Sequence, residues 1–345
     1  MKIKDVIAKL KNEYGIEYYD AKKLLKYCLN VDENYLIIHN DYEIEDTLKT
    51  TNKINCEKKS NKLLNSGKLD DKKENNKKFD LETQKINEIF EFANQIKNGK
   101  PLQYITKEQD FYGYEFYVDE RVLIPQPDTE IVVDTAIKLL KNKEKSNLAN
   151  NSKSNNKASE NLINYKTEEA SNTDFNNINE DKSNNKIEIL DLCCGSGAIG
   201  ISIKKYFGDS VNVTLSDISD DALEVAKINT KKLNANCKLV QSDMFKTIEG
   251  KFDLIVSNPP YIKTSVINSL ENNVKNEPKL ALDGGEDGLK FYKIISKNYK
   301  KYLKENGNLV LEIGYDQKDE VMQLFENSEC IKDFAGNDRV IICNK

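Results

Sequence analysis

The segment Asp253–Ile262 reads DLIVSNPPYI and joins a short apolar run to a turn that contains two adjacent prolines. Leu254–Val256 has the length and composition of a buried parallel strand, and the prolines end it. Because proline lacks a backbone N–H, the turn offers mainly carbonyl oxygens. Asn258, the Pro259 carbonyl and the Tyr261 ring are therefore presented together at the carboxyl end of a strand, where open α/β sheets bind ligands.

This group suits a planar ligand that carries an NH₂ group. The asparagine oxygen and the proline carbonyl can accept its two hydrogens, while the aromatic ring stacks on its plane. A plain proline turn with a buried tyrosine is the alternative, and the segment alone does not exclude it. The rest of the chain decides between the two interpretations.

Length, charge and hydropathy set broad limits on the protein. The 345 residues are enough for two domains, or for one domain with insertions. With 52 basic and 57 acidic residues, the formal net charge of −5 predicts no direct binding to duplex nucleic acid through its phosphates. The sequence has neither a long apolar run nor an initial signal peptide, so we expect a soluble cytoplasmic protein without a membrane segment.

Cysteine and histidine usage argues against metal chemistry. The seven cysteines are odd in number and lack metal-ligand spacing, and His39 is the only histidine. We therefore expect no metal site and no histidine general base, with His39 at a helix end or on the surface. The cysteines are expected to be reduced core residues.

The first 98 residues predict a small all-α domain. Apolar residues recur at helical spacing near both ends of segment 1–98, and Asp20 is a plausible N-cap for the second helix. Between them, residues from about 47 to 78 are rich in Lys, Asn and Glu and predict a loop or disordered insert. Such a domain lies outside the α/β pattern that follows.

The second predicted domain spans 99–345 and begins with a β-hairpin linker at 101–124, whose aromatic halves flank Gly113. Asp128 is then expected to cap a helix. A second low-complexity insert is predicted at about 141–186, where asparagine is abundant.

From residue 187 onward, short apolar runs alternate with helical patterns. Strands are predicted at 187–192, 211–216, 238–241, 252–257 and 309–313, with a final hairpin over 330–335 and 339–343. Helices are predicted at 198–206, 219–233 (capped by Ser219), 288–303 and 316–325. A βαβ series that ends in a hairpin is typical of a doubly wound sheet with an antiparallel edge.

Two strand ends carry the features of a nucleoside site. Asp191, Gly195 and Gly197 follow the first strand, where glycines let the backbone approach a ligand and the next helix directs N–H donors at it. Asp217 ends the second strand and is placed to accept two ribose hydroxyls. A tightly packed turn and an exposed turn aspartate are the alternative interpretations.

A third strand end extends this pattern. Asp243 could accept from an adenine amino group while an apolar neighbour, Phe245, covers the ring. The complete dinucleotide pattern G-x-G-x-x-G is absent, because Gly200 falls inside the helix. An adenosine ligand without phosphates, such as S-adenosylmethionine, fits these residues better than a dinucleotide.

Taken together, these motifs resemble the HemK/PrmC family, the protein-(glutamine-N5) methyltransferases of class 1 peptide chain release factors. The family belongs to the class I S-adenosylmethionine-dependent methyltransferases. The resemblance covers nearly the whole chain apart from the two inserts. The matching pieces are 101–105, 111–118, 122–130, the turn at 195–197, 258–262, 277–278, 281–292, 311–317 and 338–341.

The resemblance implies a fold, a reaction and a set of site residues. The fold would be a Rossmann-like seven-stranded class I methyltransferase sheet with an antiparallel C-terminal hairpin. A small all-α N-terminal domain, which would recognise the substrate, would precede it in the sequence. The reaction would methylate N5 of the glutamine in the Gly-Gly-Gln motif of a class 1 release factor, which would be the protein's partner, and a monomer is expected. The implied cofactor residues are Asp191, Gly195, Gly197, Asp217, Asp243, Phe245 and Asn258. The implied substrate residues are Asn258, Pro259, Pro260, Tyr261 and Phe111, of which Asn258, Pro259 and Tyr261 would be catalytic.

The chain departs from the family's pattern at four positions. Cys193 replaces the first turn glycine, and Lys107 replaces another common glycine. Gln126 and Asp128 stand where Arg and Glu are usual. These changes concern the local contacts of their segments, and a cysteine fits the first turn unless that turn requires a positive φ.

Other functions share the Asn-Pro-Pro-Tyr motif. An adenine N6 methyltransferase of nucleic acids is disfavoured by the acidic balance and by the lack of a basic recognition region. A ribosomal-protein glutamine methyltransferase is disfavoured because the segment Pro125–Glu130 resembles the release-factor branch more closely. A binding protein without turnover is the third alternative, and the intact Asn258, Pro259 and Tyr261 argue against it.

Overall fold

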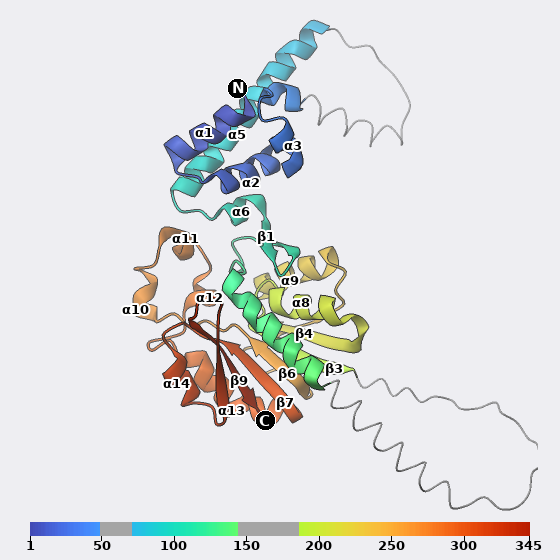
Figure 1. The fold of residues 1–345 in the computed structure, drawn as a ribbon, viewed down its shortest axis with the longest axis vertical. Helices are drawn as coiled ribbons and strands as arrows, with labels where there is room; N and C mark the ends of the chain where they lie inside the picture. Colours follow the sequence, from blue (N-terminus) through green and yellow to red (C-terminus); the bar gives the residue numbers. More distant parts are fainter. Residues whose placement is uncertain (49–70, 144–185) are drawn as a thin grey trace, which may run out of the picture. The chain divides into compact units, whose positions relative to one another are not determined.

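The computed structural model of this chain describes residues 1–48, 71–143 and 186–345 (Figure 1). These residues divide into two compact units. The first comprises Met1–Gln109, Val118–Glu120 and Asn268–Pro278. The second comprises Asp110–Tyr117, Arg121–Ile267 and Lys279–Lys345.

The first unit is helical. Its elements are α1 (Ile3–Tyr14), α2 (Tyr18–Leu29), α3 (Glu33–Ile38), α5 (Asp71–Lys97), α6 (Leu102–Thr106) and α11 (Asn272–Lys275). Leu10, Leu24 and Ile89 are fully buried where α1, α2 and α5 meet, as the helical spacing predicts. His39 is the C-cap residue of α3, and its ring stacks on Tyr35 with centroids 4.1 Å apart, so its prediction as a helix-end residue is confirmed.

Two details of the helical unit differ from the sequence-based expectation. Asp20 does not cap α2, because the helix begins at Tyr18 with Glu17 as its N-cap and Asp20 lies in the first turn. The predicted insert at about 47–78 lies partly outside the described residues, but its end, 71–78, forms the start of α5. Lysine and glutamate are good helix formers, so their abundance there did not exclude a helix.

The first unit also includes a segment that lies far away in the sequence. Asn276 donates from Nδ2 to the Gly99 carbonyl at 2.8 Å, and a Cβ added to Gly99 would lie 2.7 Å from Cβ of Asn272. Residues 268–278 therefore pack with the end of α5. In the sequence they follow soon after the Asn-Pro-Pro-Tyr turn, which belongs to the second unit. The predicted boundary near residue 98 does not capture this return of the chain.

The predicted hairpin is present as β1 (Glu108–Phe111) and β2 (Tyr114–Tyr117). Tyr112 and Gly113 form its two-residue turn with φ values of 51° and 75°. Two positive φ values are what a type I′ hairpin turn requires. Lys107, at the departure from the family's glycine, also has a positive φ of 61°.

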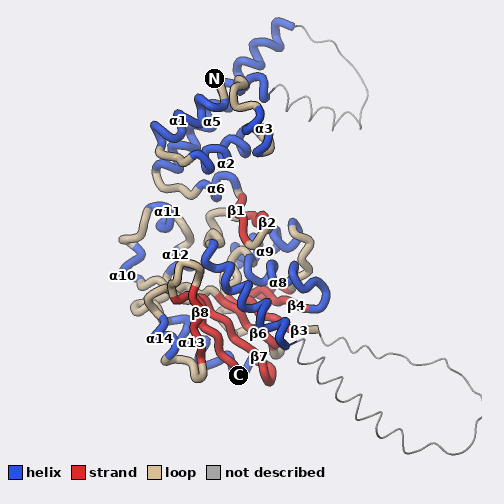
Figure 2. Tube along the Cα trace, viewed as in Figure 1, coloured by secondary structure: helices blue, strands red, loops and turns tan. Residues whose placement is uncertain are grey.

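The second unit contains a seven-stranded sheet in the order β5-β4-β3-β6-β7-β9-β8 (Figure 2). The strands are β3 (Ile187–Leu192), β4 (Val211–Asp217), β5 (Lys238–Gln241), β6 (Phe252–Ser257), β7 (Leu303–Glu312), β8 (Ser328–Lys332) and β9 (Asp338–Asn344). The pairs among β3 to β7 are parallel, whereas β9 pairs antiparallel with both β7 and β8. The predicted class I methyltransferase fold is confirmed.

Both faces of the sheet are covered by helices. Along β6, Leu254 and Val256 face one apolar cluster, which includes α8 (Ala198–Phe207), α9 (Asp220–Lys232) and the helix at 130–143. Ile255 faces the other cluster, with α13 (Lys290–Tyr302) and α14 (Lys318–Met322). Successive side chains of a strand point to opposite faces, so the central residues of a strand between two helical layers are apolar on both faces.

Several predicted boundaries in this unit were wrong. β7 begins at Leu303, not at residue 309, because the intervening segment 304–307 is polar although it continues the strand. α14 ends at Met322 rather than at residue 325. Asp128 does not cap the helix at 130–143; it lies in the 3₁₀ turn η1 (Pro127–Thr129) and forms an ion pair with Arg339 at 3.1 Å.

The cap of α9 and the second insert were also predicted from the sequence. Ser219 caps α9 by accepting a hydrogen bond from the Ala222 amide at 3.2 Å, as expected. The insert predicted at about 141–186 falls outside the described residues except at its ends, where 141–143 continue a helix.

The cysteines among the described residues are all free. Within 1–48, 71–143 and 186–345, no helix is both long and apolar enough to cross a membrane, and no group of acidic, Cys or His side chains could hold a metal ion.

Candidate active site

The register of the parallel strands brings two turns to one edge of the sheet. Leu192, the last residue of β3, pairs with Ser216 of β4 and with Ser257 of β6. The chain leaves β3 into the glycine-rich turn and leaves β6 into Asn258–Tyr261. These two turns therefore lie beside each other at the carboxyl end of the sheet, the usual ligand-binding edge of this architecture.

The turn after β3 is shaped by positive φ angles at Cys193 (61°), Gly195 (53°) and Gly197 (80°). A Cβ added to Gly195 would meet no atom within 4 Å, whereas one on Gly197 would lie 2.9 Å from Ile201. Gly195 thus leaves open surface at the edge, while Gly197 permits close packing of α8. Cys193 does occupy the left-handed region, which costs a non-glycine residue about 1 kcal/mol or more.

Asp217 ties this turn to the end of β4. Its Oδ2 accepts a hydrogen bond from the Gly195 amide at 2.9 Å, and its Oδ1 accepts one from the Ser219 amide at 3.0 Å. Burial raises the pKa of this carboxyl, and the hydrogen bonds from the Ser219 and Gly195 amides oppose the rise. Each carboxylate oxygen has two acceptor sites, so Asp217 can still accept hydroxyl hydrogens from a ligand.

Asp191 is buried beneath the same turn. Its Oδ2 accepts a hydrogen bond from the Gly200 amide at 2.8 Å, and its Oδ1 has no hydrogen-bond partner among the described residues. Burial raises the pKa of Asp191 to about 7, with the Gly200 hydrogen bond opposing and the Asp217 charge adding to the rise. A Cβ on Gly200 would lie 2.9 Å from Oδ2, so the glycine makes this contact possible.

Asp243 and Phe245 follow β5 at the same edge. Asp243 is half-buried, and its Oδ2 accepts a hydrogen bond from Lys246 at 2.6 Å. Phe245 is buried and stacks on Tyr302, with ring centroids 4.8 Å apart and planes inclined by 18°. An acceptor carboxylate and a buried aromatic ring therefore follow the third strand.

These residues fit an adenosyl ligand of the S-adenosylmethionine type. The open surface over Gly195 allows close approach to the backbone, and Asp217 and Asp243 offer carboxylate acceptors at the ends of two adjacent strands. Hydroxyl and amino groups are the donors that such acceptors bind.

The turn after β6 places Asn258 and Tyr261 in half-buried positions and buries Pro259 and Pro260. Asn258 donates from Nδ2 to Oγ1 of Thr129 at 3.3 Å. Burial raises the pKa of Tyr261, and the negative charge of Glu312 raises it further. The ring of Tyr261 is therefore neutral and available for stacking.

The backbone of this turn is held from outside. A Cβ added to Gly284 would lie 2.6 Å from Cα of Tyr261, and one on Gly288 would lie 2.5 Å from its carbonyl oxygen. Gln317 donates from Nε2 to that carbonyl at 3.2 Å, and the Gly284 amide donates to the Ile262 carbonyl at 2.8 Å. Only glycines allow the segment 282–288 to press so closely on the turn.

Three residues of this site had no predicted role: Thr129, Glu312 and Gln317. All three lie in the matching pieces of sequence, but their function depends on neighbours from distant segments. Phe111, a predicted substrate contact, is 1% exposed and packs edge-on against Phe116 in the core. The structure thus gathers Asn258, Pro259, Pro260 and Tyr261 in one turn and places Phe111 in the packed interior.

The fold and the two turns define a methyltransferase of class I. Residues 165–336 match the family model described as "Methyltransferase small domain". The chain is 36% identical over 358 residues to a release factor glutamine methyltransferase of Clostridium acetobutylicum, which covers 99% of this chain and 98% of the relative.

Two further relatives carry the same name. The protein of Clostridium botulinum is 36% identical over 78% of this chain and 84% of its own length. That of Agrobacterium fabrum is 34% identical over 70% of this chain and 74% of its own length. The chain belongs to the release factor glutamine methyltransferase family.

Proposed function

We propose that this chain transfers a methyl group from S-adenosylmethionine to N5 of the glutamine in the Gly-Gly-Gln motif of class 1 release factors. The observation that carries the proposal is the Asn258–Tyr261 turn, which offers oxygen acceptors for a substrate amide and a neutral ring. It lies beside an open glycine-rich turn. Membership in a family with this name supports the choice of substrate.

The first turn would hold the cofactor, whose sulfonium supplies the electrophilic methyl group. Gly195 and Gly197 allow the approach of the ligand, and Asp217 accepts the ribose hydroxyls. Asp243 accepts from the adenine amino group, with Phe245 beside the ring. Asp191 contributes by fixing the first turn of α8 through the Gly200 amide.

The second turn would hold the substrate amide. Oδ1 of Asn258 and the Pro259 carbonyl accept the two hydrogens of the amide nitrogen, and Tyr261 stacks on the amide plane. Pro260, which is buried, follows in the same turn, and its contact with the substrate and that of Phe111 stay predictions.

This arrangement addresses the weak nucleophilicity of an amide. The nitrogen lone pair is delocalised into the carbonyl, so the nitrogen must become more pyramidal as it reacts. Two aligned acceptors stabilise that electron-rich form more than the planar ground state, and this difference lowers the barrier. Orientation of the nitrogen contributes further. The proton can leave after the transfer, so no strong base is needed beforehand.

The test is transfer of a labelled methyl group to purified release factor. We expect label on the intact factor, no label when its Gly-Gly-Gln glutamine is replaced by alanine, and none on ribosomal proteins or DNA. Mass spectrometry should locate the added methyl on that side chain. Label on a ribosomal protein or on adenine, with an unmodified release factor, would refute the proposal.

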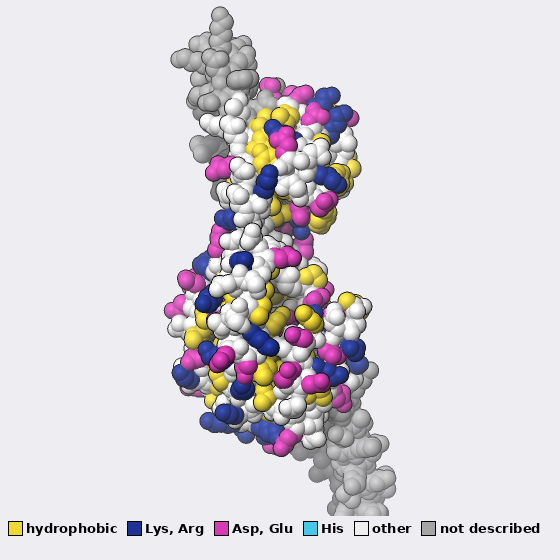
Figure 3. All heavy atoms as spheres, turned by 90° about the vertical axis from the view of Figure 1, so that its left-hand side faces the viewer, with side chains coloured by type: hydrophobic (Ala, Val, Ile, Leu, Met, Phe, Trp, Pro, Cys, Tyr) yellow, Lys and Arg dark blue, Asp and Glu magenta, His cyan; other side chains and the backbone are white. Residues whose placement is uncertain are grey.

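We further propose that the helical unit recognises the folded release factor. Large apolar side chains reach its surface among the charged ones (Figure 3). They include Tyr18, Tyr19, Ile37, Ile38 and Tyr42, with Ile38 72% exposed. Large apolar side chains that are exposed in the free protein supply area that a protein partner can bury.

Replacing Ile37 and Ile38 together by serine tests this role. We expect kcat/KM on whole release factor to fall about 100-fold, since burying such side chains contributes about 1.5 kcal/mol each and a tenfold change corresponds to about 1.4 kcal/mol. On a short Gly-Gly-Gln peptide kcat/KM should stay unchanged. Ile228→Ser, at a 37% exposed site of the other unit, is the matched control. An equal loss on both substrates would contradict the assignment.

A further inference from the structure

Glu312 lies at the centre of the substrate half of the edge. It is the last residue of β7, one position beyond Leu311, which pairs with Ser257 of β6. Because the two strands are parallel, Glu312 is level with Asn258. Its side chain is only 3% exposed.

The neighbours of this carboxyl come from several segments. Its carboxyl lies close enough to Thr129 and Asn258 for their hydrogen-bonding groups to lower its pKa, and Asn258 itself donates to Thr129 at 3.3 Å. Tyr261 interacts with the carboxyl from the same turn as Asn258. Arg339 and Asp128 provide the nearby charges, and the hydroxyl of Tyr292 donates to the Glu312 backbone carbonyl at 2.9 Å. Oε2 of Glu312 has no hydrogen-bond partner among the residues that the structure describes.

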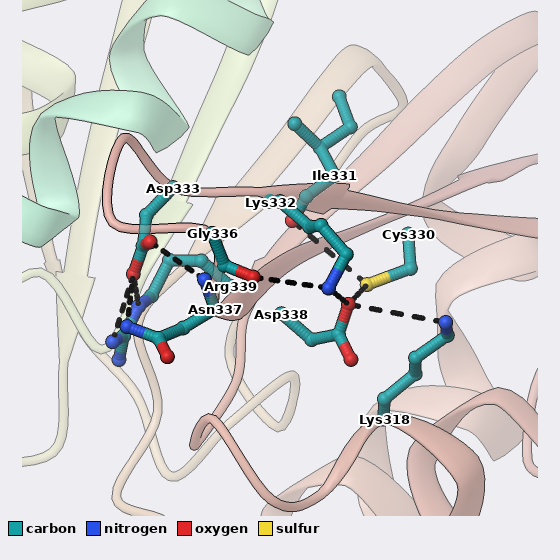
Figure 4. A network of polar contacts seen from close by, with 9 residues as sticks. All are labelled: Lys318, Cys330, Ile331, Lys332, Asp333, Gly336, Asn337, Asp338 and Arg339. Atoms are coloured by element: carbon teal, nitrogen blue, oxygen red, sulfur yellow. Dashed lines mark hydrogen bonds and ion pairs between the residues drawn. The ribbon is translucent and has the colours of Figure 1, made fainter.

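Arg339 is occupied elsewhere. It donates from Nη2 to Asp333 at 3.1 Å and pairs with Asp128 at 3.1 Å. Figure 4 shows the first contact in the turn between β8 and β9, where Lys332 also pairs with Asp338. Glu312 is therefore a buried carboxyl that lies beside the active-site turn and, in the part of the chain that the structure describes, has no ion pair with Arg339.

The chemistry of the Asn258 side chain explains why a carboxylate belongs here. An asparagine amide has an acceptor end and a donor end of nearly the same shape, and only the acceptor end can receive a substrate N–H. The Thr129 hydroxyl can donate or accept, so it cannot select one orientation by itself. An ionised carboxylate only accepts, so one placed here can bind the NH₂ end of Asn258 and the hydroxyl of Thr129 but not the Oδ1 end.

We propose that Glu312 is a positioning residue that fixes the side-chain amide of Asn258, with Nδ2 turned toward Glu312 and Thr129 and Oδ1 turned toward the substrate amide. The inference rests on the proposed function, because it assigns to Asn258 the acceptor role in that reaction. It predicts that Glu312 acts only through Asn258 and only while ionised.

The ionisation requirement gives the role a pH signature. Burial raises the pKa of Glu312 to about 7, with Asp128 adding to the rise and Thr129, Arg339 and Asn258 opposing it. A protonated Glu312 can donate to Oδ1, which would compete with the substrate. At saturating cofactor, kcat should therefore fall as the pH drops below about 7, where the carboxyl takes up its proton.

A double-mutant cycle with Asn258→Ala and Glu312→Gln tests the role. In the parent background, we expect Glu312→Gln to lower kcat about tenfold or more, since misplacement of a contacting group is costly. In the Asn258→Ala background, the same change should alter kcat by less than about threefold, because the two residues act as one unit. The acid limb of the kcat profile should be absent from Glu312→Gln.

Controls separate this role from general damage. Asp253→Asn removes another buried carboxylate, which pairs with Lys143 and Lys304 at the start of β6, and should keep the acid limb. Calorimetry of cofactor binding reports whether each variant is folded. If Glu312→Gln is not, Thr129→Val removes the shared hydroxyl without changing shape and should show the same non-additivity with Asn258→Ala.

Equal losses in both backgrounds, or an acid limb that persists in Glu312→Gln, would overturn the inference. Labelling of release factor by the parent enzyme decides the proposed function independently. An active parent with additive losses thus refutes the role of Glu312 alone.

Discussion

The turn after β3 and the turn after β6 lie at the same edge of the sheet but are built by different means. The first obtains its shape from positive φ angles at Cys193, Gly195 and Gly197. It directs the Gly195 amide at Asp217, its neighbour along the edge. The second has two prolines and takes its position from other segments, namely Gly284 and Gln317, which contact Tyr261.

The two turns therefore have different structural requirements. Local backbone geometry suffices for the cofactor turn, which needs an open approach and a few acceptors. The substrate turn must hold one side-chain amide and one ring in a fixed relation, and that requires support from several segments. We therefore expect the substrate turn to be sensitive to changes at a distance, and the cofactor turn to changes within itself.

The largest effect is expected for Asn258→Ala. Loss of an aligned polar partner of the reacting group should lower kcat about 100-fold to 1,000-fold. Cofactor affinity, measured by calorimetry, should stay close to that of the parent. Asn212→Ala, at an exposed position near the start of β4, is the control and should leave kcat nearly unchanged. A kcat within about threefold of the parent would remove Asn258 from the reaction.

Gly284→Ala tests whether the substrate turn depends on outside support. The new Cβ would meet the Tyr261 backbone at 2.6 Å, so the turn must shift. A shift of this size should lower kcat about tenfold to 100-fold and change cofactor affinity much less. Gly250→Ala adds a Cβ that meets nothing within 4 Å, at a φ of 87°. It carries backbone strain alone and should lower the melting temperature without lowering kcat.

Asp217→Asn should show the opposite pattern. The variant keeps the size of the side chain but has one acceptor oxygen in place of two, so the Gly195 and Ser219 amides and the ribose compete for it. We expect cofactor Kd to rise about tenfold, with a smaller change in kcat at saturation. Asp209→Asn, whose side chain is 98% exposed, is the control. Unchanged cofactor affinity in Asp217→Asn would contradict the assignment.

The last prediction concerns the pH dependence of stability rather than activity. Asp191 keeps its proton in the folded chain up to about pH 7, whereas its ordinary pKa is 3.8. The unfolded chain loses that proton first, so this group stabilises the fold at low pH and loses that contribution as the pH rises through this window. Denaturant titrations should show a weaker fall of unfolding free energy with pH in Asp191→Asn. The same fall in both proteins would show that Asp191 ionises normally.

Much of this protein was determined by local sequence. Alternating apolar runs and helical patterns predicted the strands from Ile187 to Ser257 almost residue by residue, because a strand covered on both faces carries a short apolar run at its centre. The glycine-rich turn and the Asn258–Tyr261 turn were also predictable. Glycine widens the range of backbone conformations wherever it occurs, and proline restricts it. The start of β7 at Leu303 was missed because its polar residues carry no such periodic signal.

What only the tertiary structure decided is how distant segments meet. The return of residues 268–278 to the helical unit depends on a contact of Asn276 with Gly99, and no local pattern predicts it. The sequence likewise contains Thr129, Asn258 and Glu312 far apart, each with an ordinary role available to it. Asn258 and Glu312 become level because β6 and β7 are adjacent and parallel, and the packing of η1 on this edge brings Thr129 to Asn258. Local chemistry fixed which groups the edge could offer, and the register of the sheet fixed which of them act together.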